Sequence, residues 1–69
     1  MQYMHVAPAQ LQPGDELYAD MGQVVASVAP AGGPWGGVLV QWQQPWLPPA
    51  HYAGTGPNAI ARVAVKRAN

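Results

Sequence analysis

A chain of 69 residues and 7.3 kDa has room for one small domain, residues 1–69, with a limited hydrophobic core. Charged residues make up 9% of the chain and the formal net charge is zero. Because most nucleic-acid-binding proteins carry an excess of basic residues, this composition argues against nucleic-acid binding. There is no cysteine, so disulfides and thiolate metal sites are excluded. A domain this small often gains stability by oligomerising or by docking on a partner.

The first part of the chain predicts two short β-strands, because apolar and polar residues alternate over residues 2–7 and 16–20. Between them, Gln12-Pro-Gly-Asp15 is typical of a tight turn with positive φ at Gly14. Asp15 is expected to bond local backbone N–H groups there. The residues expected to face the core from these strands are Met4, Val6, Leu17 and Ala19.

Three further strands are predicted at residues 23–29, 37–43 and 59–67, the second of them central. A tight hairpin turn at Asp20-Met-Gly22 leads into the first of these strands, and a broader turn at residues 30–34 leads toward the second. No stretch keeps a helical period for more than two turns, so we expect an all-β protein. The core positions expected in these strands are Val24, Ala26, Val28, Val38, Val40, Trp42, Ala61, Val63 and Val65.

Residues 44–57 are expected to form a long connection without regular structure, since they are rich in proline and glycine. Trp35 and Trp46 stand beside glycine and proline and belong to no predicted core face. Two interpretations are open for them. The Pro-rich segment folds back over the protein's own core, or an apolar surface binds a partner. The partner-binding residues in the second interpretation are Trp35, Trp46, Leu47 and Tyr52.

Three segments together, Leu11–Asp15, Gly22–Val28 and Val38–Trp42, resemble the opening of small SH3-like barrels, over about half of the chain. In such barrels a Pro-Gly-Asp corner leads into three meandering strands. The Gly-Asp corner and the Val-x-Trp strand end are also similar to those of short barrel proteins of actinobacteria. The resemblance implies a small SH3-like barrel of about five antiparallel strands with a long Pro/Trp-rich loop, and it implies no activity.

No spacing of residues indicates catalysis or a bound metal or cofactor. The acidic residues lie along one short segment, and the two histidines are too far apart in the sequence to suggest a metal site. One enzyme family with an SH3-like barrel, the plasmid-borne type of dihydrofolate reductase, uses a Val-Gln-Ile-Tyr strand. Here Val40-Gln41-Trp42 departs from that motif after two residues, so we do not expect this activity. The cations expected to contact nucleic acid, if the protein binds any, are Arg62, Lys66 and Arg67, with Arg62 and Lys66 on one strand face.

We therefore expect a non-enzymatic interaction or assembly module that binds itself or another protein subunit. The Ala-, Gly- and Pro-rich composition, with one lysine and no phenylalanine, is typical of a GC-rich genome such as that of an actinobacterium or one of its phages. A phage virion component or accessory protein is the concrete form of the module that we expect. The alternative is a monomeric SH3-like adaptor that binds a Pro-rich peptide or nucleic acid through exposed aromatics. The sequence shows neither a signal peptide nor a membrane span, which predicts a soluble protein of the cytoplasm or a virion.

Overall fold

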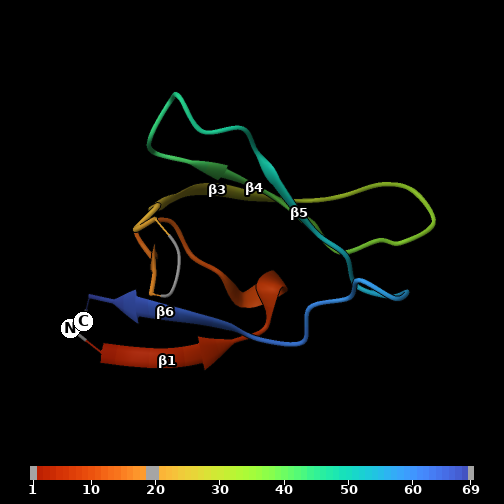
Figure 1. Ribbon diagram of the computed structural model, residues 1–69, viewed down its shortest axis with the longest axis horizontal. Coiled ribbons are helices and arrows are strands. Elements are labelled where there is room, and N and C mark those ends of the chain that lie inside the picture. Colours follow the sequence, from red (N-terminus) through yellow and green to blue (C-terminus); the bar gives the residue numbers. More distant parts are fainter. Residues whose placement is uncertain (1, 19–20, 69) are drawn as a thin grey trace.

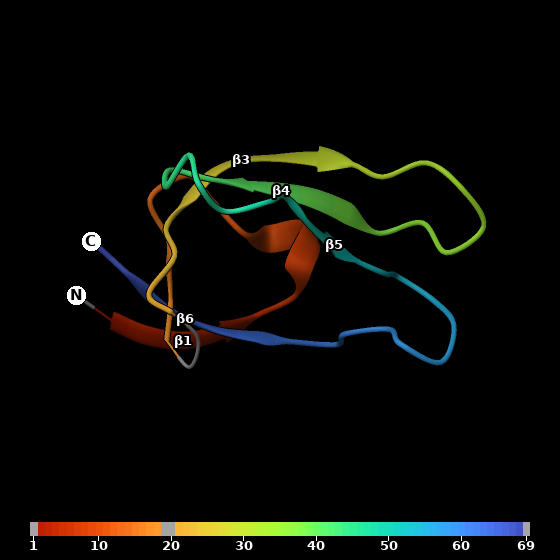
Figure 2. The same ribbon diagram turned by 45° about the horizontal axis from the view of Figure 1, so that its top comes forward.

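The computed structural model describes residues 2–18 and 21–68, which form an all-β domain of two small antiparallel sheets (Figures 1 and 2). The first sheet has the strand order β1-β6-β2 and the second has the order β3-β4-β5. The strands are β1 (Gln2–Val6), β2 (Glu16–Leu17), β3 (Val25–Pro30), β4 (Val38–Trp42), β5 (Ala50–Tyr52) and β6 (Val63–Arg67). A short 3₁₀ helix, η1 (Pro8–Gln10), follows β1. No helix in the described part of the chain could span a membrane.

The two sheets lie one above the other, and their facing side chains make one hydrophobic core (Figure 1). Val25, Val40 and Val65 are fully buried in it, so both sheets contribute to its centre. The buried core residues are Val6, Leu11, Leu17, Val25, Val38, Val40, Trp42, Val63 and Val65. Most of these side chains are valines, which makes the single large side chain, Trp42, an important part of the core volume.

Strand β4 confirms the central strand predicted from the sequence. Val38, Val40 and Trp42 are buried while Leu39 and Gln41 are exposed, so the strand alternates as expected. Neighbours pair with it on both sides, β3 along one edge and β5 along the other. The prediction that Trp42 belongs to the core is therefore confirmed.

Strand β3 was predicted correctly as a strand, but the inward positions at its start were wrong. Val25 is fully buried, whereas Val24 is half-buried and Ala26 is exposed. The cause is a β-bulge, because Val25 pairs with Trp42 while Ser27 already pairs with Gln41. A bulge places two residues of one strand opposite one of its partner and reverses the alternation at that point.

The first sheet confirms most of the core positions expected from its strands. These positions are Met4, Val6, Leu17, Val63 and Val65. Ala61 was expected to face the core and is exposed, because β6 begins only at Val63. The expected inward position of Ala19 and the turn residue Asp20 lie outside the described residues.

Strand β5 corrects the prediction that residues 44–57 lack regular structure. Ala50–Tyr52 pairs with β4, and Tyr52 lies opposite Val38. The strand has three residues and directly follows two prolines, so its alternation is too short to be recognised in the sequence. It forms because the edge of β4 offers backbone groups that need hydrogen-bond partners.

The turn before β2 is confirmed and also links the two sheets. The Asp15 N–H donates to the Gln12 carbonyl at 3.0 Å, and Gly14 has φ +94°. The Val25 N–H in turn donates to the Asp15 carbonyl at 2.8 Å. An isolated bridge between Glu16 and Val24 continues this contact, so the start of β3 runs beside the start of β2.

Candidate functional site

The charged residues of the chain all fall within residues 15–20 and 62–67 of the sequence. No Asp, Glu, Lys or Arg occurs between residues 21 and 61, the segment that supplies β3, β4, β5 and their connections. We call this segment the uncharged half. Several large apolar side chains are exposed on it, namely Met21, Trp35, Leu39, Trp46 and Ile60. Large apolar side chains exposed in a segment without charges are common at protein interfaces.

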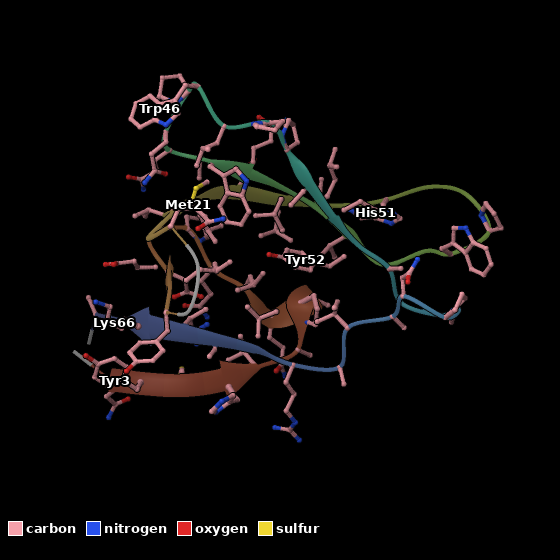
Figure 3. The ribbon with its side chains drawn as sticks, viewed as in Figure 1. Tyr3, Met21, Trp46, His51, Tyr52 and Lys66 are labelled. Carbon is pink, nitrogen blue, oxygen red and sulfur yellow. The ribbon has the colours of Figure 1, made fainter. Side chains whose placement is uncertain are left out.

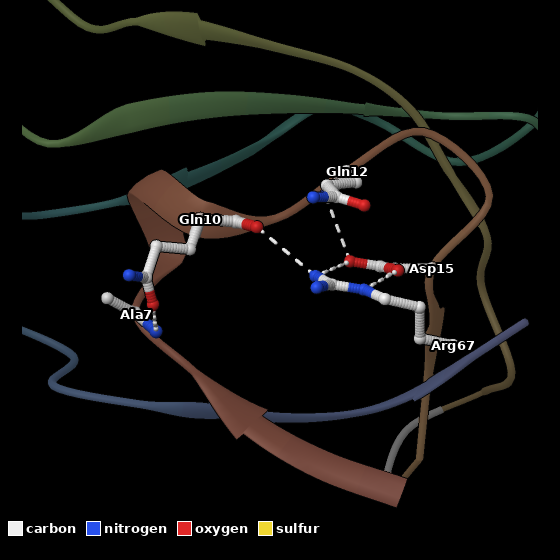
Figure 4. A network of polar contacts seen from close by, with 5 residues as sticks. All are labelled: Ala7, Gln10, Gln12, Asp15 and Arg67. Carbon is white, nitrogen blue, oxygen red and sulfur yellow. Dashed lines mark hydrogen bonds and ion pairs between the residues drawn. The ribbon is translucent and has the colours of Figure 1, made fainter. Parts of the chain in front are cut away.

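Asp15 is held in a closed polar network and has a structural role (Figure 4). Arg67 donates from Nε to Asp15 Oδ1 at 2.8 Å and from a terminal nitrogen to Oδ2 at 2.7 Å. The Gln12 N–H donates to Oδ2 at 2.9 Å, as expected for a turn carboxylate, and Arg67 also reaches the Gln10 carbonyl at 3.2 Å. The hydrogen bond from Arg67 lowers the pKa of Asp15 against the opposing effect of burial. Both carboxylate oxygens are thus already engaged.

The remaining groups that could do chemistry are dispersed. Within the described residues, no three or more His, Cys, Asp or Glu side chains come together as a metal site would need. His5 lies on β1 of the first sheet, while His51 lies on β5 of the second and bonds the Gly36 carbonyl through Nε2 at 2.8 Å.

The three cations proposed for nucleic acid do not form one basic surface. Arg67 is occupied by Asp15, and Lys66 lies 3.4 Å from a carboxylate oxygen of Glu16. Arg62 is exposed and immediately precedes β6, so it lies outside the strand that carries Lys66 and Arg67. Because two of these three cations are paired with acids, little positive charge is left to attract phosphates.

Trp46 stands at the tip of a well-fixed turn, which we call the Trp46 turn (Gln44–Leu47). The Leu47 N–H donates to the Gln44 carbonyl at 3.1 Å, with Pro45 at the first corner, where its ring favours the turn. The Gln44 side chain accepts from the Val24 N–H at 3.0 Å and donates to the Gly22 carbonyl at 3.3 Å. Trp46 itself is 75% exposed and points away from the body of the protein (Figure 3).

The segment after Trp46 folds back on the core, as one of the two interpretations expected. Leu47 packs against the core, and the Trp42 indole N–H donates to the Pro48 carbonyl at 3.1 Å. Trp46, which precedes this segment, takes no part in that packing. The Pro-rich segment is therefore anchored by its leucine and by Pro48, and this leaves Trp46 free for contact with another molecule.

The four residues predicted to bind a partner do not form one continuous surface. Trp35 and Trp46 belong to the connections before and after β4, so they lie at opposite ends of that strand. Trp35 is half exposed, and its ring packs on the backbone of Gly56 so closely that a Cβ there would overlap it. Tyr52 is half-buried and packs against the core. Of the four predicted residues, Trp46 is the one that is mostly exposed.

Two exposed tyrosines that the sequence analysis did not single out form a second surface feature. Tyr3 of β1 and Tyr18 after β2 meet edge to face with ring centroids 4.9 Å apart. They border a hollow of about 290 Å³, which we call the tyrosine hollow. Its lining residues are Tyr3, Met4, His5, Tyr18, Ala64 and Val65. Alternation alone places both tyrosines opposite the core residues Met4 and Leu17, but only the pairing of β1 and β2 on either side of β6 brings them together.

No known protein family, curated protein or solved structure matches the chain in the comparisons made with its sequence and fold.

Proposed function

We propose that the protein is a non-enzymatic interaction and assembly module, which associates with copies of itself or docks on another protein subunit through its uncharged half. The observation that carries this proposal is the segregation of charge. Residues 21–61 hold no charged side chain, yet they expose Trp35, Leu39 and Trp46. Two copies that meet through such surfaces experience no like-charge repulsion and remove apolar area from water.

The small size of the protein supports the same proposal. A chain of 69 residues with a core made mostly of valines is expected to have marginal stability, and association adds buried surface. The zero net charge also leaves little repulsion between molecules. The composition supports a GC-rich source, and a phage virion component or accessory protein is the form of assembly that we propose.

We further propose that the two sheets belong to an SH3-like barrel. The supporting observation is the order in which the strands meet. Strands β2, β3, β4 and β5 follow one another as neighbours, with β2 linked to β3 through the Glu16–Val24 bridge, and β6 pairs with the outer edge of β2. The Pro-Gly-Asp corner predicted three meandering strands, and the succession of β2, β3 and β4 supports that prediction.

Sedimentation velocity over a range of concentrations tests the proposed assembly. The wild type should exceed the monomer mass of 7.3 kDa as concentration rises, and Trp46→Ser should stay closer to it with unchanged far-UV circular dichroism. Leu47 is left intact because it packs against the core. Arg62→Ser is the matched control, since it removes an exposed side chain outside the uncharged half and should assemble like the wild type.

A wild type that stays monomeric at millimolar concentration would contradict self-association. A monomer whose NMR spectrum responds to a Pro-rich peptide or to an oligonucleotide would favour the adaptor instead.

A further inference from the structure

We infer that Trp46 of one copy inserts into the tyrosine hollow of a second copy, so that the chain assembles head to tail. The inference rests on the self-association proposed above, and only one of the two surfaces that meet belongs to the uncharged half. One is the Trp46 turn, and the other is the hollow beside Tyr3 and Tyr18 on the outer face of β1-β6-β2.

The hollow has the size and chemistry of a site for one aromatic side chain. Its volume of about 290 Å³ is slightly below the roughly 300–1,000 Å³ that small-molecule sites occupy, as a site for a single side chain requires. Ala64 has the smallest side chain of the outer row and lies between His5 on β1 and Tyr18, whose N–H donates to the Ala64 carbonyl at 3.0 Å. The two tyrosine rings, at 90° to each other, offer edges and faces to a third ring.

Trp46 is presented in a form suited to insertion. Its turn is fixed by Pro45, by the clamp that Gln44 makes on Gly22 and Val24, and by the packing of Leu47 on the core. A side chain on such a preorganised turn loses little conformational entropy when it is bound. No hydrogen bond of the Trp46 indole N–H occurs in the described part of the chain, so this group is free to donate to a partner.

The contact must occur between two molecules. Trp46 lies beyond the second sheet and Tyr3 on the first, at opposite sides of the molecule in Figure 3. Trp35 is a poorer candidate for insertion, because its ring already packs on Gly56 and its carbonyl accepts hydrogen bonds from Gly54 and Thr55.

Charges near the hollow do not oppose this contact. Lys66 is paired with Glu16 at 3.4 Å and lies 6.0 Å from the centre of the Tyr3 ring, so these two charges beside the hollow offset each other. The entering segment, residues 43–50, has no charged side chain either. The contact therefore depends on aromatic and apolar packing and should be insensitive to moderate salt.

A contact between two different surfaces leaves one of each unused at the ends of every assembly. Such heterologous contacts build open chains or rings, whereas a symmetric contact stops at the dimer. Each copy thus has one donor, Trp46, and one acceptor, the tyrosine hollow. This asymmetry makes a mixing experiment decisive.

The donor-blocked variant is Trp46→Ser, and the acceptor-blocked variant is Tyr3→Ser with Tyr18→Ser. A second acceptor-blocked variant, Ala64→Leu, fills the floor of the hollow and keeps both tyrosines. The matched control is Ile60→Ser, because Ile60 is an exposed apolar residue that belongs to neither of the two surfaces. Sedimentation velocity should find each blocked variant monomeric and the control assembled like the wild type. An equimolar mixture of donor-blocked and acceptor-blocked chains should give a species of twice the monomer mass and nothing larger.

A second measurement uses a peptide that carries residues 43–50 as the probe. Added to the full-length Trp46→Ser protein, it should shift the ring resonances of Tyr3 and Tyr18 in NMR spectra and leave those of Tyr52 unchanged. The same peptide with serine in place of its tryptophan should produce no shift.

The outcomes separate the inference from the function on which it rests. If the wild type assembles but the mixture stays monomeric, or if both acceptor-blocked variants assemble like the wild type, the head-to-tail contact is wrong and the assembly function stands. An absent response of Tyr3 and Tyr18 to the peptide would equally overturn the contact. A monomeric wild type would overturn self-association itself.

Discussion

Replacing Trp42 with alanine is expected to remove most of the protein's stability. Trp42 is 9% exposed, lies opposite the fully buried Val25 and donates its indole N–H to the Pro48 carbonyl. Deletion of a buried tryptophan side chain costs about 3–5 kcal/mol. The unfolding free energy of a domain of 69 residues is about 3–10 kcal/mol at the usual rate per residue. The variant should therefore be largely or partly unfolded at room temperature.

Trp42→Phe separates the ring from its hydrogen bond. Phenylalanine keeps much of the apolar volume and loses the N–H that holds Pro48, so the expected loss is about 1–2 kcal/mol. Trp46→Ala is the matched control, because the same residue type is 75% exposed there and its removal should change the stability by less than about 0.5 kcal/mol. Urea unfolding, followed by far-UV circular dichroism at low protein concentration, measures all three variants.

The reasoning would be refuted by Trp42→Ala and Trp46→Ala having the same unfolding midpoint. It would also fail if Trp42→Phe were as destabilised as Trp42→Ala, since the volume of the ring would then contribute nothing.

The remaining predictions concern the turn and the close contacts around β4 and β5. Because Arg67 lowers the pKa of Asp15 in the folded protein, the unfolded chain takes up a proton first on acidification. Stability should fall below about pH 4, with a shallower fall in Asp15→Asn, which thermal unfolding at several pH values measures. Gly14→Ala should cost roughly 1–2 kcal/mol, because its positive φ is strained but a Cβ meets no atom within 4 Å. Gly37→Ala should cost more than about 3 kcal/mol in the same urea assay, because its Cβ would overlap the backbone of Tyr52 and Gly54 as well. Equal losses in the two glycine variants would contradict this close approach.

The residues of the candidate site could be predicted only in part from the sequence. The sequence placed Trp46 outside every predicted core face, because a segment without alternation offers none, but it left open whether this segment covers the core or binds a partner. The interpretation that joined Trp46 with Trp35 and Tyr52 grouped residues that are near one another in the sequence, yet Trp35 and Tyr52 lie at the Val38 end of β4 and Trp46 follows its other end. The tyrosine hollow went unnoticed for the opposite reason, since Tyr3 and Ala64 are far apart in the chain and adjacent in the sheet.

Local physics explains what the sequence by itself determined. Alternation over residues 37–43 set the faces of β4, and proline followed by glycine set the turn at Gly14, because both depend on a few neighbouring residues. Tertiary structure alone decided the bulge that turns Val25 inward, the pairing of β5 with the edge of β4, and the ion pair of Asp15 with Arg67. Each of these contacts joins segments that are distant in the sequence. Hydrogen bonding and packing in the whole fold determine which segments pair, and no local sequence pattern indicates these pairings.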